Sequence, residues 1–541
     1  MLKCSWYNNF PSIFDFKEVE ELMNTKNNAH DFGVSLKFLG ANCGIVTGSA
    51  TLFTAKLGNI TRNILVDKGC FQGVDEIYNE YREIDGSIID AVLLTHPHLD
   101  HCDDIPSFYL EANCKYSFNG KIYASLETCK EAVHILRDAA RVNAIKANGK
   151  NGIIRREKRR LAIKREKAIR KDYKSKDIAK IDSDYCKLDE QDRILPYGTE
   201  EVEEALKHFV PIVFKPTDRH VDVELFPGIT ARFIPTSHIN GSCMILLTAS
   251  YEDQSYTVAF TGDIGREETL LYKKSRFITN SKVNSVVMES LHGAESTPNR
   301  LSVSIENFQK LIARNLKKNK FVVIPSFGLD RTAAIVFLMN LFMSRGMHFK
   351  CFLDSPLGLE ELKEYDLAYK SGNSAWFKDL GEDPFSLDNI IVPENYMEHQ
   401  YFASSYGPSV TITSSCMGHG GRVLDYFEHH VQDELATFIF PGFLTVDSPS
   451  RILLETPKGS MCELNGRRYI KRCDTYWFQD FSSHGYYDDK CNILDSFPNL
   501  EQIFLNHGSD DTIRELFYEF QNRYPNVSIS VPSFEDSIVL T

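Results

Sequence analysis

The sequence predicts an α/β protein built from more than one domain. Its 541 residues exceed what one ordinary hydrophobic core holds. Residues 35–110 contain short apolar segments punctuated by Gly, Asn or Asp, as strands joined by turns are. In residues 293–470, apolar runs alternate with segments of helical periodicity, a pattern typical of a parallel sheet covered by helices on both faces.

The expected elements follow in order along the chain. Strands are predicted first in SLKFLGANCGIVTGSATLF, NILVDKGCFQG and IIDAVLLT, and a helix from Leu126 to about Ala147. Strands return in ELFPGITARFIPTSH, SYTVAFTGDIGR and VNSVVMES. A helix over residues 305–316, the strand FVVIPS, a helix from Arg331 and the strand HFKCFLDSP form the alternating region. The tail adds the strand EQIFLNHG and the helix DTIRELFYEFQNRY.

Composition and charge limit the class of protein. The apolar fraction of 43% and the charged fraction of 25% are those of a folded soluble protein. Thirteen cysteines without a C-x-x-C pair favour free thiols in a reducing compartment. MLKCSWYNNF shows no signal peptide, and the longest apolar run, AAIVFLMNLFM, is about half a membrane span. We therefore expect a cytoplasmic protein without a membrane partner; a homodimer is left open.

One segment departs from the acidic character of the chain. The net charge is −13, so a polyanionic ligand would need a local positive field. Residues 151–180 hold thirteen Lys or Arg against four acidic residues. We expect a basic helical insertion at about 148–185, which either tracks a phosphate backbone or forms a solvated helical hairpin with no ligand.

The densest chemical signal is LLTHPHLDHCDD, residues 93–104. It places His96, His98, Asp100 and His101 directly after an apolar run. On a loop leaving a strand, the first two can hold one metal ion while the other two turn toward a second. Two such ions can clamp the attacking and leaving oxygens of a phosphoryl group. The alternative is a polar turn that happens to be rich in histidine.

Further candidate ligands share one local pattern. His238 in FIPTSHINGS, Asp263 in FTGDIGR and His507 in IFLNHGSDD each follow an apolar run and precede a glycine by one to three residues. A lone histidine of this kind is more often structural. Several strand-end ligands together with the dense motif favour a metal centre.

In combination, these motifs resemble a known superfamily. The order DKGCFQG, HPHLDH, SHINGS and TGD is similar to that of the metallo-β-lactamase superfamily. IPSFGLDRT, LDSPL, SSCMGHGGRVL, DFSSHGYYDD and LNHG resemble its β-CASP branch of nucleases, which includes the endonuclease subunit of the polyadenylation machinery and prokaryotic relatives. The similarity runs from about Leu39 to about Gly508. It implies an αββα sandwich formed by residues 1–292 and 471–541, with a β-CASP α/β domain inserted at 293–470.

The resemblance also implies roles for individual residues. It places His96, His98 and His238 on one zinc ion, and Asp100, His101 and His507 on another. Asp263 would bridge the two ions, whose shared hydroxide would be the nucleophile, and Asp67 would fix the tautomer of an imidazole. His484 would protonate the leaving oxygen and be oriented by Glu289. The candidate phosphate contacts are Arg331, Ser415 and Arg422.

Some positions depart from the pattern of the family. ESLHG replaces the usual ESTYG, PGFLTVDSPSR stands where relatives carry a Gly-Tyr-rich segment with Glu-Gly-Thr, and Asp330 occupies a position where a small residue is common. His507 favours RNA over DNA, because DNA-processing members typically lack this histidine. We therefore expect a zinc-dependent ribonuclease that acts on single-stranded RNA. A DNA-directed nuclease, a small-molecule hydrolase on the same fold and a catalytically inactive subunit remain as alternatives, and the mode of cutting stays open.

Overall fold

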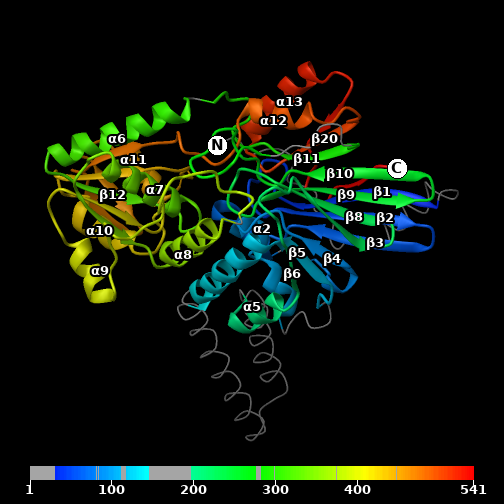
Figure 1. Cartoon of the computed structure of the whole chain (residues 1–541), viewed down its shortest axis with the longest axis horizontal. Coiled ribbons are helices and arrows are strands. Elements are labelled where there is room, and N and C mark those ends of the chain that lie inside the picture. Colours follow the sequence, from blue (N-terminus) through cyan, green and yellow to red (C-terminus); the bar gives the residue numbers. More distant parts are fainter. Residues whose placement is uncertain are drawn as a thin grey trace, which may run out of the picture.

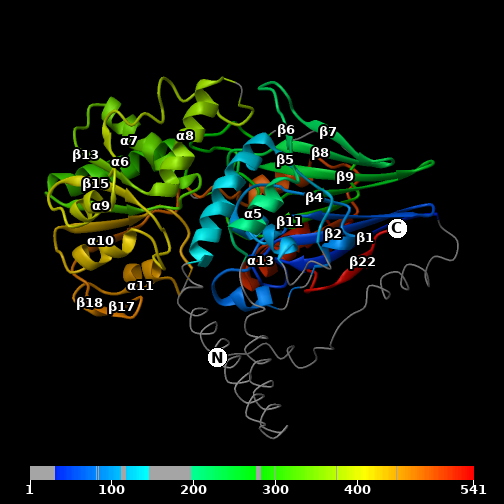
Figure 2. The same ribbon diagram turned by 90° about the horizontal axis from the view of Figure 1, so that it is seen from below.

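A computed structural model describes residues 31–80, 82, 84–110, 117–144, 197–275, 282–297, 299–372, 374–445 and 447–541. Two seven-stranded sheets form a larger lobe, and a six-stranded sheet forms a smaller lobe beside it (Figures 1 and 2). The expected basic insertion at about 148–185 lies outside the described residues.

The first sheet of the larger lobe has the order β22-β1-β2-β3-β4-β5-β6. Its strands are β1 (Phe32–Gly40), β2 (Ala50–Leu57), β3 (Ile60–Val66), β4 (Ala91–Leu93), β5 (Lys121–Ser125), β6 (Phe209–Ile212) and β22 (Ser537–Val539). The second sheet has the order β21-β20-β11-β10-β9-β8-β7. Its strands are β7 (Val221–Phe226), β8 (Ile229–Pro235), β9 (Cys243–Tyr251), β10 (Gln254–Phe260), β11 (Ser285–Glu289), β20 (Gln502–Asn506) and β21 (Ser528–Ser530).

The two sheets pack face to face. Their inner faces share one apolar core, in which the rings of Phe38 from β1 and Phe504 from β20 lie 5.4 Å apart. The outer face of the first sheet is covered by the helix at 126–144 and by α5 (Thr199–Leu206). The outer face of the second sheet is covered by α12 (Tyr487–Leu494) and α13 (Asp510–Arg523). Figure 1 shows these helices on opposite sides of the paired sheets, so the lobe is an αββα sandwich.

The smaller lobe is built on an entirely parallel sheet with the order β14-β13-β15-β12-β16-β19. Its strands are β12 (Phe321–Pro325), β13 (Lys350–Asp354), β14 (Ile390–Ile391), β15 (Ser409–Thr413), β16 (Ala436–Phe440) and β19 (Asp474–Trp477), and β17 (Met461–Leu464) and β18 (Arg467–Ile470) form a separate hairpin. The helices around it are α6 (Leu301–Lys317), α7 (Arg331–Ser344), α8 (Pro356–Lys370), α9 (Tyr396–Ala403), α10 (Val423–His430) and α11 (Pro449–Glu455). The central strands are buried along their whole length, because helices cover both faces.

The smaller lobe is inserted between two neighbouring strands of the larger one. β11 enters it and β20 follows it, and these two strands pair in parallel with Val287 opposite Phe504. The α/β sandwich with an inserted α/β domain predicted from the sequence is therefore the observed architecture. No helix among the described residues is long and apolar enough to cross a bilayer.

Candidate metal centre

The candidate ligands all lie just beyond the ends of strands. His96 and His98 follow β4, and α2 (Leu99–Cys102) carries the next two candidates. His238 lies between β8 and β9, Asp263 follows β10 and His507 follows β20. Because these strands belong to both sheets of the sandwich, residues separated by up to 411 positions in the chain meet at one edge of it.

Four of these residues form a first group. The Nδ1 atom of His98 lies 3.0 Å from Nε2 of His96 and 3.3 Å from Nε2 of His238. The Oδ2 atom of Asp263 lies 3.4 Å from Nε2 of His96 and 3.5 Å from Nε2 of His238. Three ring nitrogens and one carboxylate oxygen therefore converge within 4.8 Å of one another.

The second group lies on the other side of Asp263. The Nε2 atom of His507 is 3.0 Å from Nε2 of His101 and 3.3 Å from Oδ2 of Asp100. The Oδ1 atom of Asp263 lies 3.2 Å from Nε2 of His101 and 3.4 Å from Nε2 of His507. One carboxylate thus presents one oxygen to each group.

The donor set of both groups suits a divalent metal ion. Ligand atoms about 2.0–2.2 Å from a tetrahedral zinc lie roughly 3.3–3.6 Å apart, close to the observed separations of 3.0–3.5 Å. Imidazole nitrogens and carboxylate oxygens are the ligands that zinc accepts. The buried Oδ1 of Asp263 and Nδ1 of His507 have no hydrogen-bond partner among the described residues. The arrangement therefore fits a pair of bound cations.

The electrostatics of the two groups differ. Burial lowers the pKa of His96 to about 3 and that of His98 to about 4, and it lowers the pKa of His238 well below its ordinary value. These imidazoles are therefore neutral at physiological pH, as a metal ligand must be. Burial also acts to lower the pKa of His507, but Asp263 and Asp100 raise it to about 9. Loading a metal ion on the second group must therefore release a proton.

Asp67 and Thr95 contact the Nδ1 atoms of two candidate ligands, His101 and His96. The Oδ2 atom of Asp67 lies 2.8 Å from Nδ1 of His101. The Thr95 hydroxyl donates to the same carboxylate at 2.9 Å and lies 3.0 Å from Nδ1 of His96. A hydroxyl that donates to Asp67 accepts from the Nδ1–H of His96, which leaves Nε2 of that ring free to bind a metal. The sequence did not predict a supporting role for Thr95, because this residue looks like the end of the apolar run. Its position directly before the H-x-H motif is the only feature that indicates such a role.

Glycine allows the supporting loops to approach closely. A Cβ atom on Gly69, two residues after Asp67, would lie 1.8 Å from the backbone of Asp100. A Cβ atom on Gly265, two residues after Asp263, would lie 2.3 Å from the backbone nitrogen of His238. Each glycine is therefore required by the close packing of two neighbouring loops.

His484 lies beside the first group without joining it. Its Nδ1 is 3.0 Å from Oε2 of Glu289, a side chain that is 1% exposed, and 3.8 Å from Oδ2 of Asp263. A backbone bridge between Gly265 and His484 ties this histidine to the Asp263 loop. Burial acts to lower the pKa of His484, but Glu289 raises it above its ordinary value. The geometry thus pairs one imidazole with a carboxylate and places it next to the metal groups.

His292 occupies the unusual position in ESLHG. Its Nε2 lies 2.9 Å from Oγ of Ser482, and its ring stacks on Tyr486 at 4.3 Å. It therefore supports, from both sides, the segment that carries His484.

Comparison with known proteins agrees with this geometry. The family model of the metallo-β-lactamase superfamily matches residues 44–287, and that of the β-CASP domain matches residues 332–453. The chain carries a metallo-β-lactamase domain and a β-CASP domain.

Several relatives are similar in sequence to this chain over most of its length. "Ribonuclease TTHA0252" of Thermus thermophilus is 24% identical over 87% of this chain and 92% of its own. "Probable RNase MJ4" of Methanocaldococcus jannaschii is 23% identical over 83% of this chain and 88% of its own. "Transcription termination factor FttA" of Methanococcus maripaludis is longer: 24% identity extends over 66% of this chain but only 47% of that relative.

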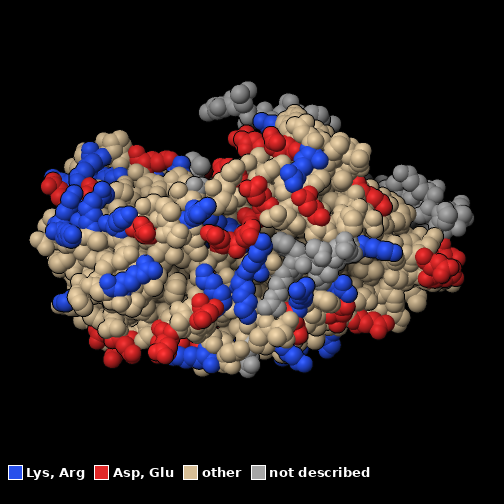
Figure 3. Space-filling model, turned by 45° about the horizontal axis from the view of Figure 1, so that its top comes forward, with Lys and Arg blue, Asp and Glu red and all other residues tan. Residues whose placement is uncertain are grey.

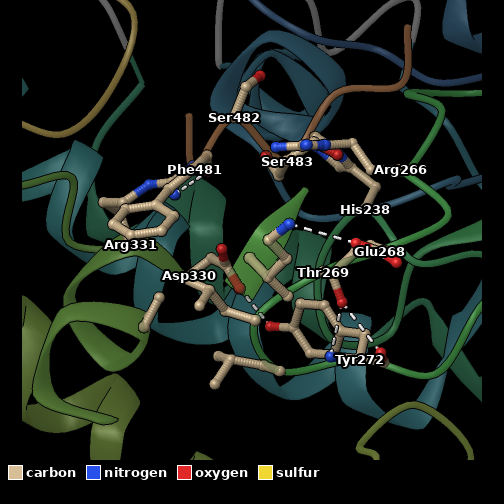
Figure 4. A pocket seen from close by; sticks show the side chains of 14 residues that line it. His238, Arg266, Glu268, Thr269, Tyr272, Asp330, Arg331, Phe481, Ser482 and Ser483 are labelled. Atoms are coloured by element: carbon tan, nitrogen blue, oxygen red, sulfur yellow. Dashed lines mark hydrogen bonds between the residues drawn. The ribbon is translucent and has the colours of Figure 1, made fainter. Parts of the chain in front are cut away.

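The three candidate phosphate contacts lie in the β-CASP domain. Arg331 is 8% exposed, its guanidinium donates to the backbone carbonyl of Phe481, and it lines a pocket that also contains His238 (Figure 4). Arg422 forms an ion pair with Asp354 at the end of β13. Ser415 is half-buried after β15. The described contacts connect neither Arg422 nor Ser415 with the metal groups.

Asp330 joins the two domains. It has a left-handed backbone (φ 60°), and its carboxylate accepts the Tyr272 hydroxyl, while its backbone N–H donates to Glu361. Any residue except proline could donate the N–H, but a small apolar residue could not accept the Tyr272 hydroxyl, so the aspartate adds a buried side-chain hydrogen bond between the domains.

Proposed function

We propose that this β-CASP protein is a ribonuclease that holds two zinc ions and hydrolyses phosphodiester bonds of single-stranded RNA. The observation that carries the proposal is the position of Asp263, whose two oxygens each lie 3.2–3.5 Å from a separate set of imidazoles. His96, His98 and His238 would hold one ion, and Asp100, His101 and His507 the other. When bound, the two ions would supply positive charge for the phosphate and lower the pKa of a water.

His484 and Glu289 complete the proposed chemistry. Glu289 faces Nδ1 of His484 at 3.0 Å, so it fixes the ring and stabilises its protonated form. The Nε2–H then donates its proton to the oxygen that leaves the phosphorus. Glu289 raises the pKa of His484 above its ordinary value, which favours the protonated form that a general acid requires.

Two observations favour RNA as the substrate. His507 completes the second ligand group, and the relatives of similar length are named ribonucleases.

Although the net charge is −13, basic side chains gather at the end of the β-CASP domain where α6 terminates (Figure 3). The exposed members on this helix and just after it are Lys310, Arg314, Lys317 and Lys318. Such a local positive field attracts a polyanion.

The alternatives are less well supported. A small-molecule hydrolase needs neither the β-CASP domain nor the pair of His484 and Glu289. A catalytically inactive subunit would have no reason to retain all seven ligand positions. We also propose to end the β-CASP domain after Trp477 rather than at residue 470, because β19 is an edge strand of its sheet.

The direct test is cleavage of matched substrates by the zinc-loaded protein. Uniformly labelled and 5′-labelled single-stranded RNA and DNA of one sequence are digested in parallel and the products sized. The proposal expects RNA to be cut and DNA to be spared, and the 5′ label distinguishes internal cleavage from stepwise release. Preferential cleavage of DNA, or hydrolysis of small esters alone, would overturn it.

A further inference from the structure

Four neighbouring strands of the β-CASP sheet end in an apolar side chain at the same edge. Phe327 follows β12, Met417 follows β15, Phe443 follows β16, and Trp477 is the last residue of β19. The sheet order β15-β12-β16-β19 places these strand ends side by side. Phe443 is 61% exposed and the other three are partly exposed. We call these four residues the aromatic shelf.

The loops that carry the shelf are tied to one another. The indole Nε1 of Trp477 donates to the carbonyl of Gly442 at 2.8 Å. A Cβ atom on Gly442 would lie 3.2 Å from the ring of Phe327, so this backbone packs directly on that ring. The Thr445 hydroxyl contacts the sulfur of Met417 at 3.8 Å. These contacts hold the loops together, so the four residues belong to one surface.

Phe443 is held outward by its neighbours. Gly442 before it and Leu444 after it are buried, the latter with 1% exposure. Burying a phenylalanine is worth about 1.5–3 kcal/mol, and the anchored backbone denies that gain to Phe443 in the free protein. Single exposed apolar residues are common, but an exposed ring on a loop whose backbone contacts Phe327 and Trp477 marks a contact surface.

Guanidinium groups accompany the aromatic rings. The Cζ atom of Arg451 lies 4.1 Å from the centroid of the Trp477 ring. Arg314, on α6, donates to the hydroxyl of Tyr476, the residue before Trp477, at 2.9 Å. Arg314 thus adjoins the strand that ends in the shelf, whereas Lys317 and Lys318 precede β12 and lie toward the opposite edge of the sheet. Aromatic rings beside arginines are the composition that binds unpaired bases and their phosphates.

The shelf is also continuous with the candidate metal centre. Trp477 precedes His484 by seven residues, which span at most about 25 Å. Figure 1 shows this orange segment passing from the β-CASP domain to the sandwich. The Phe327 loop leads to Arg331, which binds the carbonyl of Phe481 in the same segment. The carboxyl edge of a parallel sheet is where ligands usually bind, because the loops there converge.

We propose that the aromatic shelf stacks unpaired bases of the RNA whose phosphodiester lies at the metal centre, with Phe443 as the main stacking ring. The proposal rests on the proposed function and adds a second contact to it. It predicts that the shelf recognises bases without reading their sequence, since every base has a stacking face.

The test compares three variants of the full-length, zinc-loaded protein. Phe443→Ala removes the ring, Phe443→Trp retains a stacking surface, and Tyr406→Ala is the matched control. Tyr406 is 69% exposed but precedes β15, so it lies at the opposite edge of the same sheet. The first readout is kcat and KM on single-stranded RNA of roughly 20 nucleotides. The second is the Kd for the same RNA, measured by fluorescence anisotropy with each change placed in a His484→Ala background.

Loss of one stack predicts that Phe443→Ala raises KM and Kd about 5- to 150-fold while kcat changes less than about twofold. Phe443→Trp and Tyr406→Ala should stay within about twofold of the parent protein. Abasic RNA of the same length should bind the parent more weakly and show no difference between the parent and Phe443→Ala.

Three results would overturn the shelf. They are an unchanged KM and Kd in Phe443→Ala, an equal loss in Tyr406→Ala, or an equal loss on abasic RNA, which would assign the effect to phosphates. If RNA binds in a Phe443-dependent manner but the parent protein does not cut it, the shelf stands and the proposed ribonuclease activity fails. If RNA is cut and Phe443→Ala changes neither KM nor Kd, the proposed ribonuclease activity stands and the shelf proposal fails.

Discussion

At the scale of single residues, His484 and His507 have different surroundings although both are histidines near one end of the chain. His507 faces Asp100, His101 and Asp263 at 3.0–3.4 Å, whereas Nδ1 of His484 faces Glu289 at 3.0 Å. The first environment suits a metal ligand, and the second suits an acid whose ring is oriented by a carboxylate.

His484→Ala should therefore separate catalysis from metal binding. We expect both zinc ions to remain and RNA affinity to change only a few fold, while kcat falls about 10²- to 10⁴-fold, since a proton donor contributes that much. Metal analysis together with RNA turnover checks this. Loss of metal from His484→Ala, or cleavage at the parental rate, would contradict the assignment of His484 as the acid.

Thr95 offers a second test at this scale. Thr95→Val keeps the shape of the side chain but removes the hydroxyl that links Asp67 with His96. Zinc affinity, measured by competition with a chelator, should weaken about 10- to 100-fold, as for other groups that orient metal ligands. Thr248→Val is the control, because its hydroxyl pairs with that of Thr257 between β9 and β10 and contacts no candidate ligand among the described residues. Equal affinities in the two variants would show that Thr95 has no such role.

The sequence predicted the separate ligands better than their supports. His96, His238 and His507 each stand in a recognisable strand-end pattern, so the residues that meet in the two groups were named in advance. Thr95 could not be named, because its role depends on a carboxylate 28 residues earlier in the chain. Arg331 stays a candidate phosphate contact, and its guanidinium also donates to a backbone carbonyl 150 residues away, which no local pattern reveals.

At the scale of elements, the close contact between the loop after β3 and α2 places both supporting and ligand residues. Lys68 donates its backbone N–H to the carbonyl of His101 at 2.8 Å, and Gly69 follows directly. This close contact between the loop and α2 leaves no room for a side chain at position 69.

Gly69→Ala should therefore destabilise the sandwich. The added Cβ would lie 1.8 Å from the Asp100 backbone, so one of the two loops must move. We expect a loss of about 1–3 kcal/mol or more in the free energy of unfolding, together with weaker zinc binding. Gly420→Ala, where no atom lies within 4 Å of the new Cβ, should unfold like the parent protein. Denaturant unfolding of both variants measures the difference, and equal midpoints would refute it.

The contact between the helix at 126–144 and the β-CASP helices contains buried carboxyl groups. Burial raises the pKa of Glu131 and of Glu361 well above the ordinary value of 4.5, and nearby carboxyls including Asp330 add to the shift. Between pH 4.5 and their folded-state pKa values, these two carboxyl groups are therefore protonated in the folded state and ionised in the unfolded state. The stability that these groups contribute is present below pH 4.5 and is lost as the pH rises through their folded-state pKa values.

Replacing both acids should flatten this dependence. In the double variant Glu131→Gln and Glu361→Gln, Tm should decline less than in the parent protein as the pH rises above about 5. Glu519→Gln, an exposed residue of α13, should keep the parental slope. Thermal unfolding of the metal-loaded proteins across this pH range is the measurement, and parallel slopes for all three would contradict the explanation.

Local patterns identified most elements because their apolar periodicity reflects burial. Residues 305–316 predicted a helix, and α6 spans Leu301–Lys317. The helix predicted from Leu126 to Ala147 is described to residue 144. The order of strands in the sheets could not be read in this way, since β11 and β20 pair across an insertion of more than 200 residues.

At the scale of the whole molecule, the two domains place different chemistry at one junction. The sandwich contributes the seven candidate ligands and Glu289, whereas the segment that leaves the β-CASP domain contributes His484. The family resemblance predicted this architecture as a whole, but the aromatic shelf and the network around Asp330 depend on contacts between distant loops.

The central claim is a pair of metal ions bridged by Asp263, and elemental analysis of the zinc-supplemented protein tests it most directly. We expect two equivalents of zinc per chain in the parent protein, and about one in His507→Ala, because that change removes a ligand from only the second group. Less than one equivalent in the parent protein, or two in His507→Ala, would contradict the claim.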